Sequence, residues 1–149
     1  MDIKSPEERS KNMAAIRNKD TKPEIAFRKM LFARGYRYRK NVNYIPGHPD
    51  LWLAKYHTAI FVHGCFWHRH EGCKYAYMPK SRIDFWEGKF KRNIEHDADV
   101  WGMLQKERVR ELIVWECTIR NMMKSQAVRE NVMCQVEEFL SGDTEYLEL

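Results

Sequence analysis

Two short runs of mostly apolar residues constrain the fold of this chain most strongly. Residues 58–62 (TAIFV) and 112–115 (LIVW) are each long enough for one buried strand. Between them lies a segment whose apolar residues recur at intervals near 3.6, the period of an amphipathic helix. Strands separated by a helix predict a small α/β domain in which helices cover a mixed sheet.

Two helix starts precede the first run. Ser5 and Thr21 each stand just before a proline in the first turn, and a glutamate follows three positions after each of them. This is the pattern of a capped helix N-terminus. The second of these helices is expected to reach Arg34 and to stop at Gly35.

Further strands and helices follow from the same reasoning. Residues 36–39 (YRYR) alternate like an edge strand, and Asp50 opens a strand at 51–53 because the preceding PGHP excludes regular structure. Residues 81–84 (SRID) are expected to cap the long helix. The stripe along that helix comprises Trp86, Phe90, Ile94, Asp97, Trp101 and Leu104, and a last helix carries Val128, Val132, Val136, Phe139 and Leu140.

Length and composition indicate one domain spanning residues 1–149, of which 44% are hydrophobic. No segment approaches the roughly 18 consecutive apolar residues of a membrane helix. The N-terminus has no apolar run typical of a secretory signal. We therefore expect a protein of the reducing cytoplasm, where cysteines serve better as metal ligands than in disulfides.

The net charge of +5 is unevenly distributed. Residues 141–149 form an acidic tail with three acids and no Lys or Arg, so the remaining chain carries 26 basic against 18 acidic residues, a charge of +8. A basic body suits a polyanionic partner, because neutralised phosphates release condensed counterions. A solvated basic face is the alternative explanation.

Four residues form a donor set of three thiols and one imidazole: Cys65, His70, Cys73 and Cys117. Such a set is expected of a structural zinc site, in which Cys117, at the end of a second strand, would tie the loop from 65 to 73 to the sheet. A single cysteine is more often a small buried hydrophobe, and Cys134 in the last helix is expected to be one.

His63 and His68 remain once a four-coordinate zinc site is filled. Histidines beside a strand end in a basic protein are candidates for proton transfer or phosphate contact. Exposed polar loop residues are an equally good explanation from position alone.

The motifs that follow one another along the chain are RSKNM at 9–13, a helix start at Asp20-Thr21, PGHPD at 46–50, HGCFWH at 63–68, FW at 85–86, Asn93, Asp97 and VWEC at 114–117. In this order they resemble the very-short-patch-repair mismatch endonucleases, over nearly the whole chain from Arg9 onward. Such coverage is far more specific than any one motif.

This resemblance implies a restriction-endonuclease-like core and magnesium-dependent, strand-specific nicking of duplex DNA beside the thymine of a T:G mismatch. Such mismatches arise when 5-methylcytosine deaminates, and the nick starts their repair. It also implies a monomeric bacterial enzyme of the cytoplasm, used at the nucleoid, that does not enter membranes. Mismatch-repair proteins are candidate further partners, and residues 1–20 would form a DNA-contacting N-terminal helix.

Carried over position by position, the resemblance makes Asp50 and the backbone carbonyl of Val62 the magnesium contacts. His63 and His68 would act near the scissile phosphate, with His68 activating water. Glu24 and Asp97 would be supporting acids that orient these histidines, and the zinc ligands would be Cys65, His70, Cys73 and Cys117. Glu24 fits a capping box equally well. Asp50 and Val62 can meet if their strands are antiparallel neighbours, and both suit a hard cation.

Aromatic residues supply recognition if the resemblance holds. It implies that Phe66, Trp67 and Trp86 wedge into the base stack, where unstacking is cheapest beside a poor base pair. Core packing is the alternative, and it is expected for Trp101 and Trp115. The remaining DNA contacts that we expect are Lys89, Asn93 and Met13, although a solvated helix face also explains Lys89 and Asn93.

Two other functions are compatible with the sequence. One is a zinc-containing DNA-binding module without catalysis, which the basic body, the aromatics and the cysteines fit equally well. The other is a related nuclease of a restriction system. Asp50 and the two remaining histidines favour an enzyme, because a protein that only binds DNA has no use for them.

Overall fold

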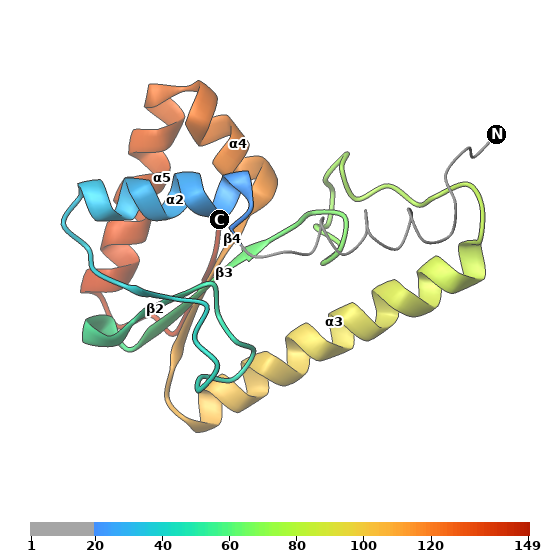
Figure 1. The fold of residues 1–149 in the computed structure, drawn as a ribbon, viewed down its shortest axis with the longest axis horizontal. Helices are drawn as coiled ribbons and strands as arrows, with labels where there is room; N and C mark the ends of the chain where they lie inside the picture. The colour runs from blue at the N-terminus through green and yellow to red at the C-terminus, as the bar shows by residue number, and fades with distance from the viewer. Residues whose placement is uncertain (1–19) are drawn as a thin grey trace.

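A computed structural model describes residues 20–149, and Figure 1 shows its arrangement. The strands are β1 (Arg39–Lys40), β2 (Leu51–Leu53), β3 (Thr58–His63), β4 (Arg110–Trp115) and β5 (Tyr146–Glu148). They form one sheet in the order β1-β2-β3-β4-β5. The first three strands pair antiparallel, whereas β4 is parallel to β3 and β5 is parallel to β4. The predicted mixed sheet is confirmed.

The helices cover both faces of this sheet. They are α2 (Lys22–Ala33), the short 3-10 helix η1 (Ala54–Tyr56), α3 (Ile83–Lys106), α4 (Glu116–Lys124) and α5 (Gln126–Ser141). Helices α2, α4 and α5 lie on one side, and α3 crosses the other side and extends beyond the sheet (Figure 1). No helix within residues 20–149 is long and apolar enough to cross a membrane.

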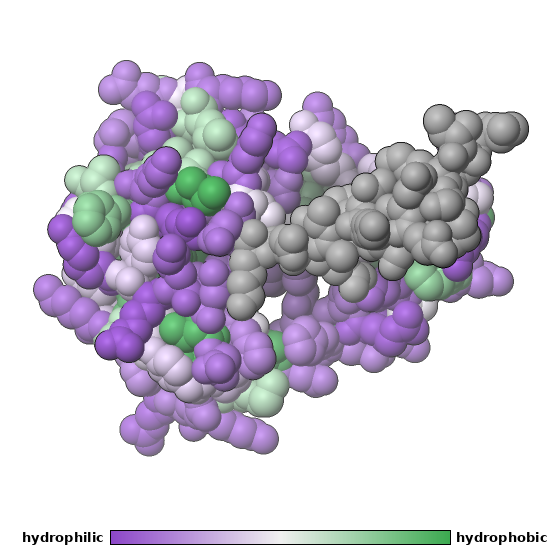
Figure 2. All heavy atoms as spheres, in the orientation of Figure 1, coloured by the Kyte–Doolittle hydropathy of each residue, from purple (hydrophilic) through white to green (hydrophobic). Residues whose placement is uncertain are grey.

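Alternate residues of the central strands separate two hydrophobic clusters. Ile60, Leu112 and Val114 pack with α2, α4 and α5, whereas Phe61 and Ile113 point the other way and pack under α3. This alternation is the period-2 pattern of strands buried on both faces. The outer surface is mostly hydrophilic on the face that Figure 2 shows, with apolar residues in small separate areas.

Helix α2 begins and ends where the sequence predicts. The Thr21 hydroxyl accepts a hydrogen bond from the Glu24 N–H at 3.4 Å, and a proline stands in the first turn. At the other end Gly35 has a φ of +93°, a left-handed conformation that glycine adopts without strain. The Tyr36 N–H then donates to the carbonyl of Leu31.

That last hydrogen bond explains why the strand expected at 36–39 is wrong in extent. The Tyr36 N–H already serves the end of α2, and pairing begins only at Arg39. Two exposed, charged residues therefore form the edge strand β1, an arrangement that discourages pairing with other chains.

Two expectations for α3 are corrected. Ser81 is not its N-cap: Arg82 occupies that position with a φ of 55°, and its carbonyl accepts from the Trp86 N–H. Ile94 is 53% exposed rather than buried, although Phe90 in the same half of α3 is buried and packs against Phe66. Phe90, Val100 and Leu104 are the buried residues of this helix.

The C-terminal region also departs from the expectation. The predicted last helix is confirmed as α5, which Ser125 caps through its hydroxyl, but α4, which precedes it, was not predicted. Cys134 is exposed rather than in the core, since it shares a helix face with the exposed Glu130 and Glu138, four residues away on either side. The end of the acidic tail forms strand β5.

Candidate active site and metal centre

One cavity of about 770 Å³ lies at the C-terminal end of β3. It gathers most of the site residues predicted from the sequence, from α2, β3, the following loop, α3 and α4. Those lining it are Glu24, Asp50, Val62, His63, Cys65, Phe66, Trp67, His68, Lys89, Asn93, Asp97 and Cys117. His70, Cys73 and Trp86 do not line it, and Met13 lies outside the described residues.

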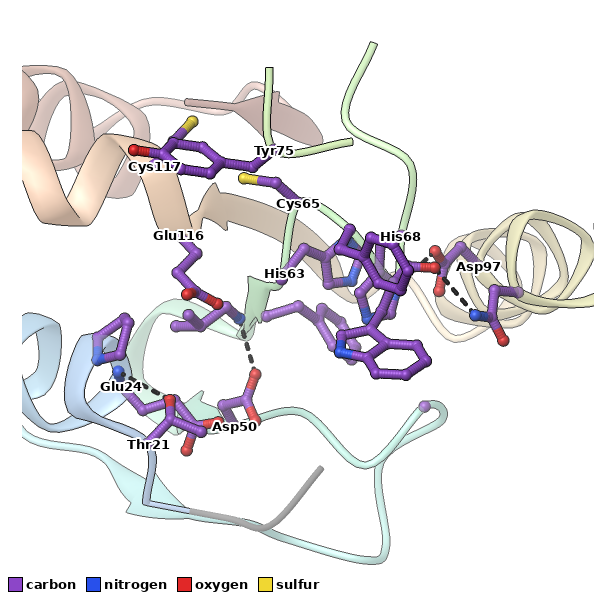
Figure 3. Close-up of a pocket in the computed structure, with 18 of the residues that line it drawn as sticks. Thr21, Glu24, Asp50, His63, Cys65, His68, Tyr75, Asp97, Glu116 and Cys117 are labelled. Atoms are coloured by element: carbon purple, nitrogen blue, oxygen red, sulfur yellow. Dashed lines mark hydrogen bonds and ion pairs between the residues drawn. The ribbon is translucent and has the colours of Figure 1, made fainter. Parts of the chain in front are cut away.

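Asp50 joins the start of β2 to the end of β3. Its Oδ2 accepts a hydrogen bond from the Val62 N–H at 2.7 Å (Figure 3). The two strands are antiparallel neighbours, as this contact requires. Burial and, next, the nearby Glu24 raise the pKa of Asp50 to about 7. A carboxylate that is held this way keeps its charge most readily when a cation is beside it.

The two histidines form a stacked pair with an acid behind them. The rings of His63 and His68 lie 3.8 Å apart and within 5° of parallel. Nδ1 of His68 is 2.7 Å from Oδ2 of Asp97 on α3 (Figure 3). Burial lowers the pKa of His63 to about 3, and His68 adds to that effect, so His63 is a neutral imidazole at physiological pH.

Glu24 has a local partner as well as a place in the cavity. Its Oε2 accepts from the Asp20 N–H at 2.9 Å. Burial raises the pKa of Glu24 above its usual value. The side chain thus supports the start of α2, as a capping residue does, while it faces Asp50 (Figure 3).

Four donor atoms cluster above this cavity. Cys65, His70, Cys73 and Cys117 each present one ligand atom, and these atoms all lie within 4.8 Å of one another. Sγ of Cys117 is 3.4 Å from Nδ1 of His70. A tetrahedral zinc with Zn–S near 2.3 Å and Zn–N near 2.0 Å separates its ligands by roughly 3.5–3.8 Å. The four residues can therefore hold a metal ion of this kind.

The same cluster ties three elements together. Cys65 follows β3, Cys117 stands in the first turn of α4, two residues beyond the end of β4, and Cys73 belongs to the loop between β3 and α3. The His70 ring stacks on Trp115 at 4.2 Å, which orients it. Cys117 was expected at a strand end, and it lies within two residues of one.

The aromatic residues form one cluster at the cavity rim. Phe66 packs against Trp67 at 5.0 Å and against Trp86 at 5.4 Å between ring centroids. Asn93 donates its side-chain amide to the Trp67 carbonyl at 2.9 Å, so it fixes the loop that carries these rings. Trp115 is buried and Trp101 packs partly buried against the core, as expected for both.

Two acids that line the cavity, Glu116 and Glu111, were not singled out as site residues from the sequence. Glu116 pairs with Arg120 one helical turn away, and its place in the VWEC motif could have drawn attention to it. Glu111 is 3% exposed, and one of its carboxylate oxygens has no hydrogen-bond partner. Nothing in the local sequence distinguishes Glu111 from an exposed acid at the start of a strand.

Comparisons with known proteins show the family of this chain. The model of the family DNA mismatch endonuclease Vsr matches residues 1–74. The chain is 44% identical over 120 residues to the type II nicking enzyme V.NmeAIP of Neisseria meningitidis serogroup A, covering 80% of this chain and 85% of that protein.

Two further relatives extend the match along the chain. The DNA mismatch endonuclease Vsr of Escherichia coli K12 is 36% identical over 142 residues, which cover 95% of this chain and 89% of that enzyme. The type II nicking enzyme V.XorIIP of Xanthomonas oryzae is 38% identical over 129 residues, 87% of this chain and 94% of that protein. The chain therefore belongs to the Vsr family of DNA mismatch endonucleases and is an endonuclease.

Proposed function

We propose that this endonuclease acts as a monomer and, with magnesium, nicks duplex DNA beside the thymine of a T:G mismatch. The observation that carries the proposal is the pairing of Asp50 with Val62 opposite the His68–Asp97 pair in one cavity. Hydrolysis of a phosphodiester needs a cation near the phosphate and a base for the attacking water. Asp50 and Val62 offer ligands for the cation, and His68 with Asp97 offers the base.

Asp50 and Val62 are the proposed magnesium contacts. In a strand the N–H and C=O of one residue point to the same side, so the Val62 carbonyl shares the edge that its N–H presents to Asp50. A carboxylate and a carbonyl suit magnesium, which keeps water in its other positions. When bound there, the ion would polarise a phosphoryl oxygen and stabilise charge on the phosphate.

His68 is the proposed general base. Asp97 holds the proton of a neutral His68 on Nδ1, which leaves the lone pair of Nε2 available to water. The water oxygen forms a bond to phosphorus as its proton passes to Nε2. The bridging P–O bond breaks, and the released sugar oxygen takes up a proton from solvent water. His63, buried and neutral, supports the His68 ring by stacking and contacts the phosphate without adding charge. Glu24 is proposed as a supporting acid at the start of α2, and its negative charge near Asp50 raises the pKa of that carboxyl.

The cysteine and histidine cluster is proposed to hold structural zinc. Three thiolates and one imidazole complete four-coordination, so no position stays open for a substrate. The ion would fix the loop after β3 relative to α4 and thereby position His68. Metal analysis tests this directly and should find about one zinc per chain.

Mismatch recognition is assigned to the aromatic cluster. Phe66, Trp67 and Trp86 would enter the base stack beside the mispair, where unstacking costs least. Lys89 and Asn93, one helical turn apart on α3, are the proposed polar DNA contacts. Met13 is a further proposed DNA contact. Asn93 also positions Trp67, because its side-chain amide donates a hydrogen bond to the Trp67 carbonyl.

The test uses a duplex with one T:G mispair, a matched duplex and magnesium. We expect a nick in the thymine strand of the first and none in the second. Asp50→Asn should abolish nicking and retain binding, whereas Asp143→Asn, an exposed acid far along the chain, should behave as the parent protein. Equal cutting of matched DNA would refute the mismatch specificity, and full activity of Asp50→Asn would refute the mechanism. Loss of nicking without loss of binding also separates an enzyme from a pure DNA-binding module.

A further inference from the structure

The segment between the last cysteine of the cluster and α3 has a composition suited to nucleic acid. Residues 74–82 contain three cations, two tyrosines and no acid. Tyr77 is 62% exposed and Tyr75 is 40% exposed, and Met78 is also exposed. Aromatic rings flanked by cations suit a nucleic acid, because bases stack on the rings while the cations neutralise phosphates.

Arg69 fastens this segment to the loop that carries Phe66. Its guanidinium donates to the carbonyls of Phe66 at 3.1 Å, Tyr77 at 3.1 Å and Ala76 at 2.7 Å. The same group lies over the Phe90 ring, 3.8 Å from its centroid. Arg69 itself has a φ of 56°, a conformation that costs a non-glycine residue energy and is retained only where neighbours enforce it.

As a result, Tyr77 stands directly beside the aromatic cluster. Its ring centroid is 5.2 Å from that of Phe66, with the ring planes tilted by 45°. More than half of the Tyr77 side chain remains exposed, so the contact with Phe66 does not explain its position as core packing. A ring that is exposed yet already fixed loses little conformational entropy when it binds a ligand.

We propose that Tyr77 is a fourth aromatic DNA contact, which packs against the duplex beside Phe66, and that Arg69 is the positioning residue that holds it there. The occupant of this surface is the DNA itself, given the neighbouring cations Lys74, Lys80 and Arg82 and the absence of acids in residues 74–82. This inference rests on the proposed function only in that DNA lies over the aromatic cluster. It does not depend on T:G specificity or on magnesium.

The test measures binding without catalysis. Parent protein, Tyr77→Ala and Tyr77→Phe are titrated with a T:G duplex in the absence of magnesium. Loss of one stacked ring is expected to weaken binding by roughly tenfold, since base–aromatic stacking is worth about 1–3 kcal/mol. Tyr77→Phe retains the ring and should bind within about twofold of the parent protein.

Phe32→Ala is the matched control, because Phe32 is also an exposed aromatic (53%) and lies near the end of α2, on the opposite side of the molecule from residues 74–82 (Figure 1). Arg69→Lys provides a second measurement, since an ammonium cannot hold three carbonyls in one plane, and it should weaken binding in the same direction. Tyr77→Ala, Tyr77→Phe and Phe32→Ala should retain the zinc content and, within experimental error, the melting temperature of the parent protein.

Unchanged affinity of Tyr77→Ala would overturn the inference, and so would an equal loss in Phe32→Ala. The outcome is separable from that of the proposed function. If the parent protein fails to nick T:G duplexes but Tyr77→Ala still binds DNA about tenfold more weakly than the parent, the Tyr77 contact with DNA is supported and the proposed mismatch nicking is refuted. If the parent protein nicks T:G duplexes and Tyr77→Ala binds DNA as tightly as the parent, the proposed function is supported and the Tyr77 contact is refuted.

Discussion

Oδ2 of Asp97 lies 2.7 Å from Nδ1 of His68, so a neutral His68 carries its proton on Nδ1 and presents Nε2 toward the cavity. The acid sits on α3 and the histidine on the loop after β3, so the pair also couples the long helix to the sheet. The stacked ring of His63 supports His68 from the strand.

Asp97→Asn should reduce the nicking rate by roughly a hundredfold or more, the usual contribution of a positioned general base. The amide can donate to Nδ1, which places the imidazole proton on Nε2 and removes the acceptor for water. Single-turnover nicking of a T:G duplex measures the chemical step, and a separate titration should show DNA affinity within about twofold of the parent protein.

Asp99→Asn on the same helix is the control, because Asp99 is exposed and does not line the cavity. It should nick at the parental rate. Equal losses in both variants would mean that charge on α3, rather than the contact with His68, is responsible.

Much of the fold follows from local sequence signals. The two apolar runs became β3 and β4, and Thr21 and Gly35 delimit α2, because short-range rules of burial and capping govern these segments. Strand β5 escaped prediction because Tyr146, Leu147 and Glu148 form a strand only through pairing with β4, a contact made after the chain has turned back.

The candidate site divides in the same way. The antiparallel contact of Asp50 with Val62 was foreseeable, since both residues stand at the ends of identifiable strands. Residue types predicted the Cys and His cluster, but the sequence gives no distance between Cys117 and His70. Glu111 was not foreseeable at all, because its burial depends on α3 crossing above it and on β5 beside it.

Cys117→Ser should lower both the zinc content and the thermal stability. The ion ties the loop after β3 to α4, and we expect a loss of about 3 kcal/mol, or about 10 °C in the melting temperature. Cys134→Ser is the matched control, since Cys134 is exposed on α5 and outside the cluster. A zinc-free parent protein that melts cooperatively at the same temperature would contradict the structural role of the ion.

Gly47→Ala should destabilise the turn before Asp50. Gly47 has a φ of +80°, and a Cβ there would stand 2.5 Å from Cγ1 of Val100 and 3.0 Å from the Phe61 ring. Left-handed strain and overpacking should together cost roughly 2–5 kcal/mol in the free energy of unfolding. Urea denaturation measures that loss.

Gly35→Ala separates the two contributions. Gly35 has a similar φ of +93°, but a Cβ there would meet nothing within 4 Å. This variant should lose only the roughly 1–2 kcal/mol of the left-handed conformation. Equal losses of unfolding free energy in Gly47→Ala and Gly35→Ala would show that the side chains of Val100 and Phe61 move aside without a measurable loss of stability.

Glu111→Gln should raise stability at neutral pH and above. Burial, and then Asp97 and Glu148, raise the pKa of Glu111 from 4.5 to about 7. Between these values the native state binds more protons than the unfolded chain, so the stabilisation present below pH 4.5 is lost as pH rises toward 7. The full loss is roughly 3 kcal/mol at 1.36 kcal/mol per pKa unit. Glutamine is neutral throughout, so the difference in unfolding free energy between variant and parent should grow as the pH rises across this window.

Glu107→Gln is the control, because Glu107 is an exposed acid at the end of α3. It should show no such trend with pH. Parallel pH profiles for Glu111→Gln and the parent protein would mean that Glu111 is ionised at little cost in the native state.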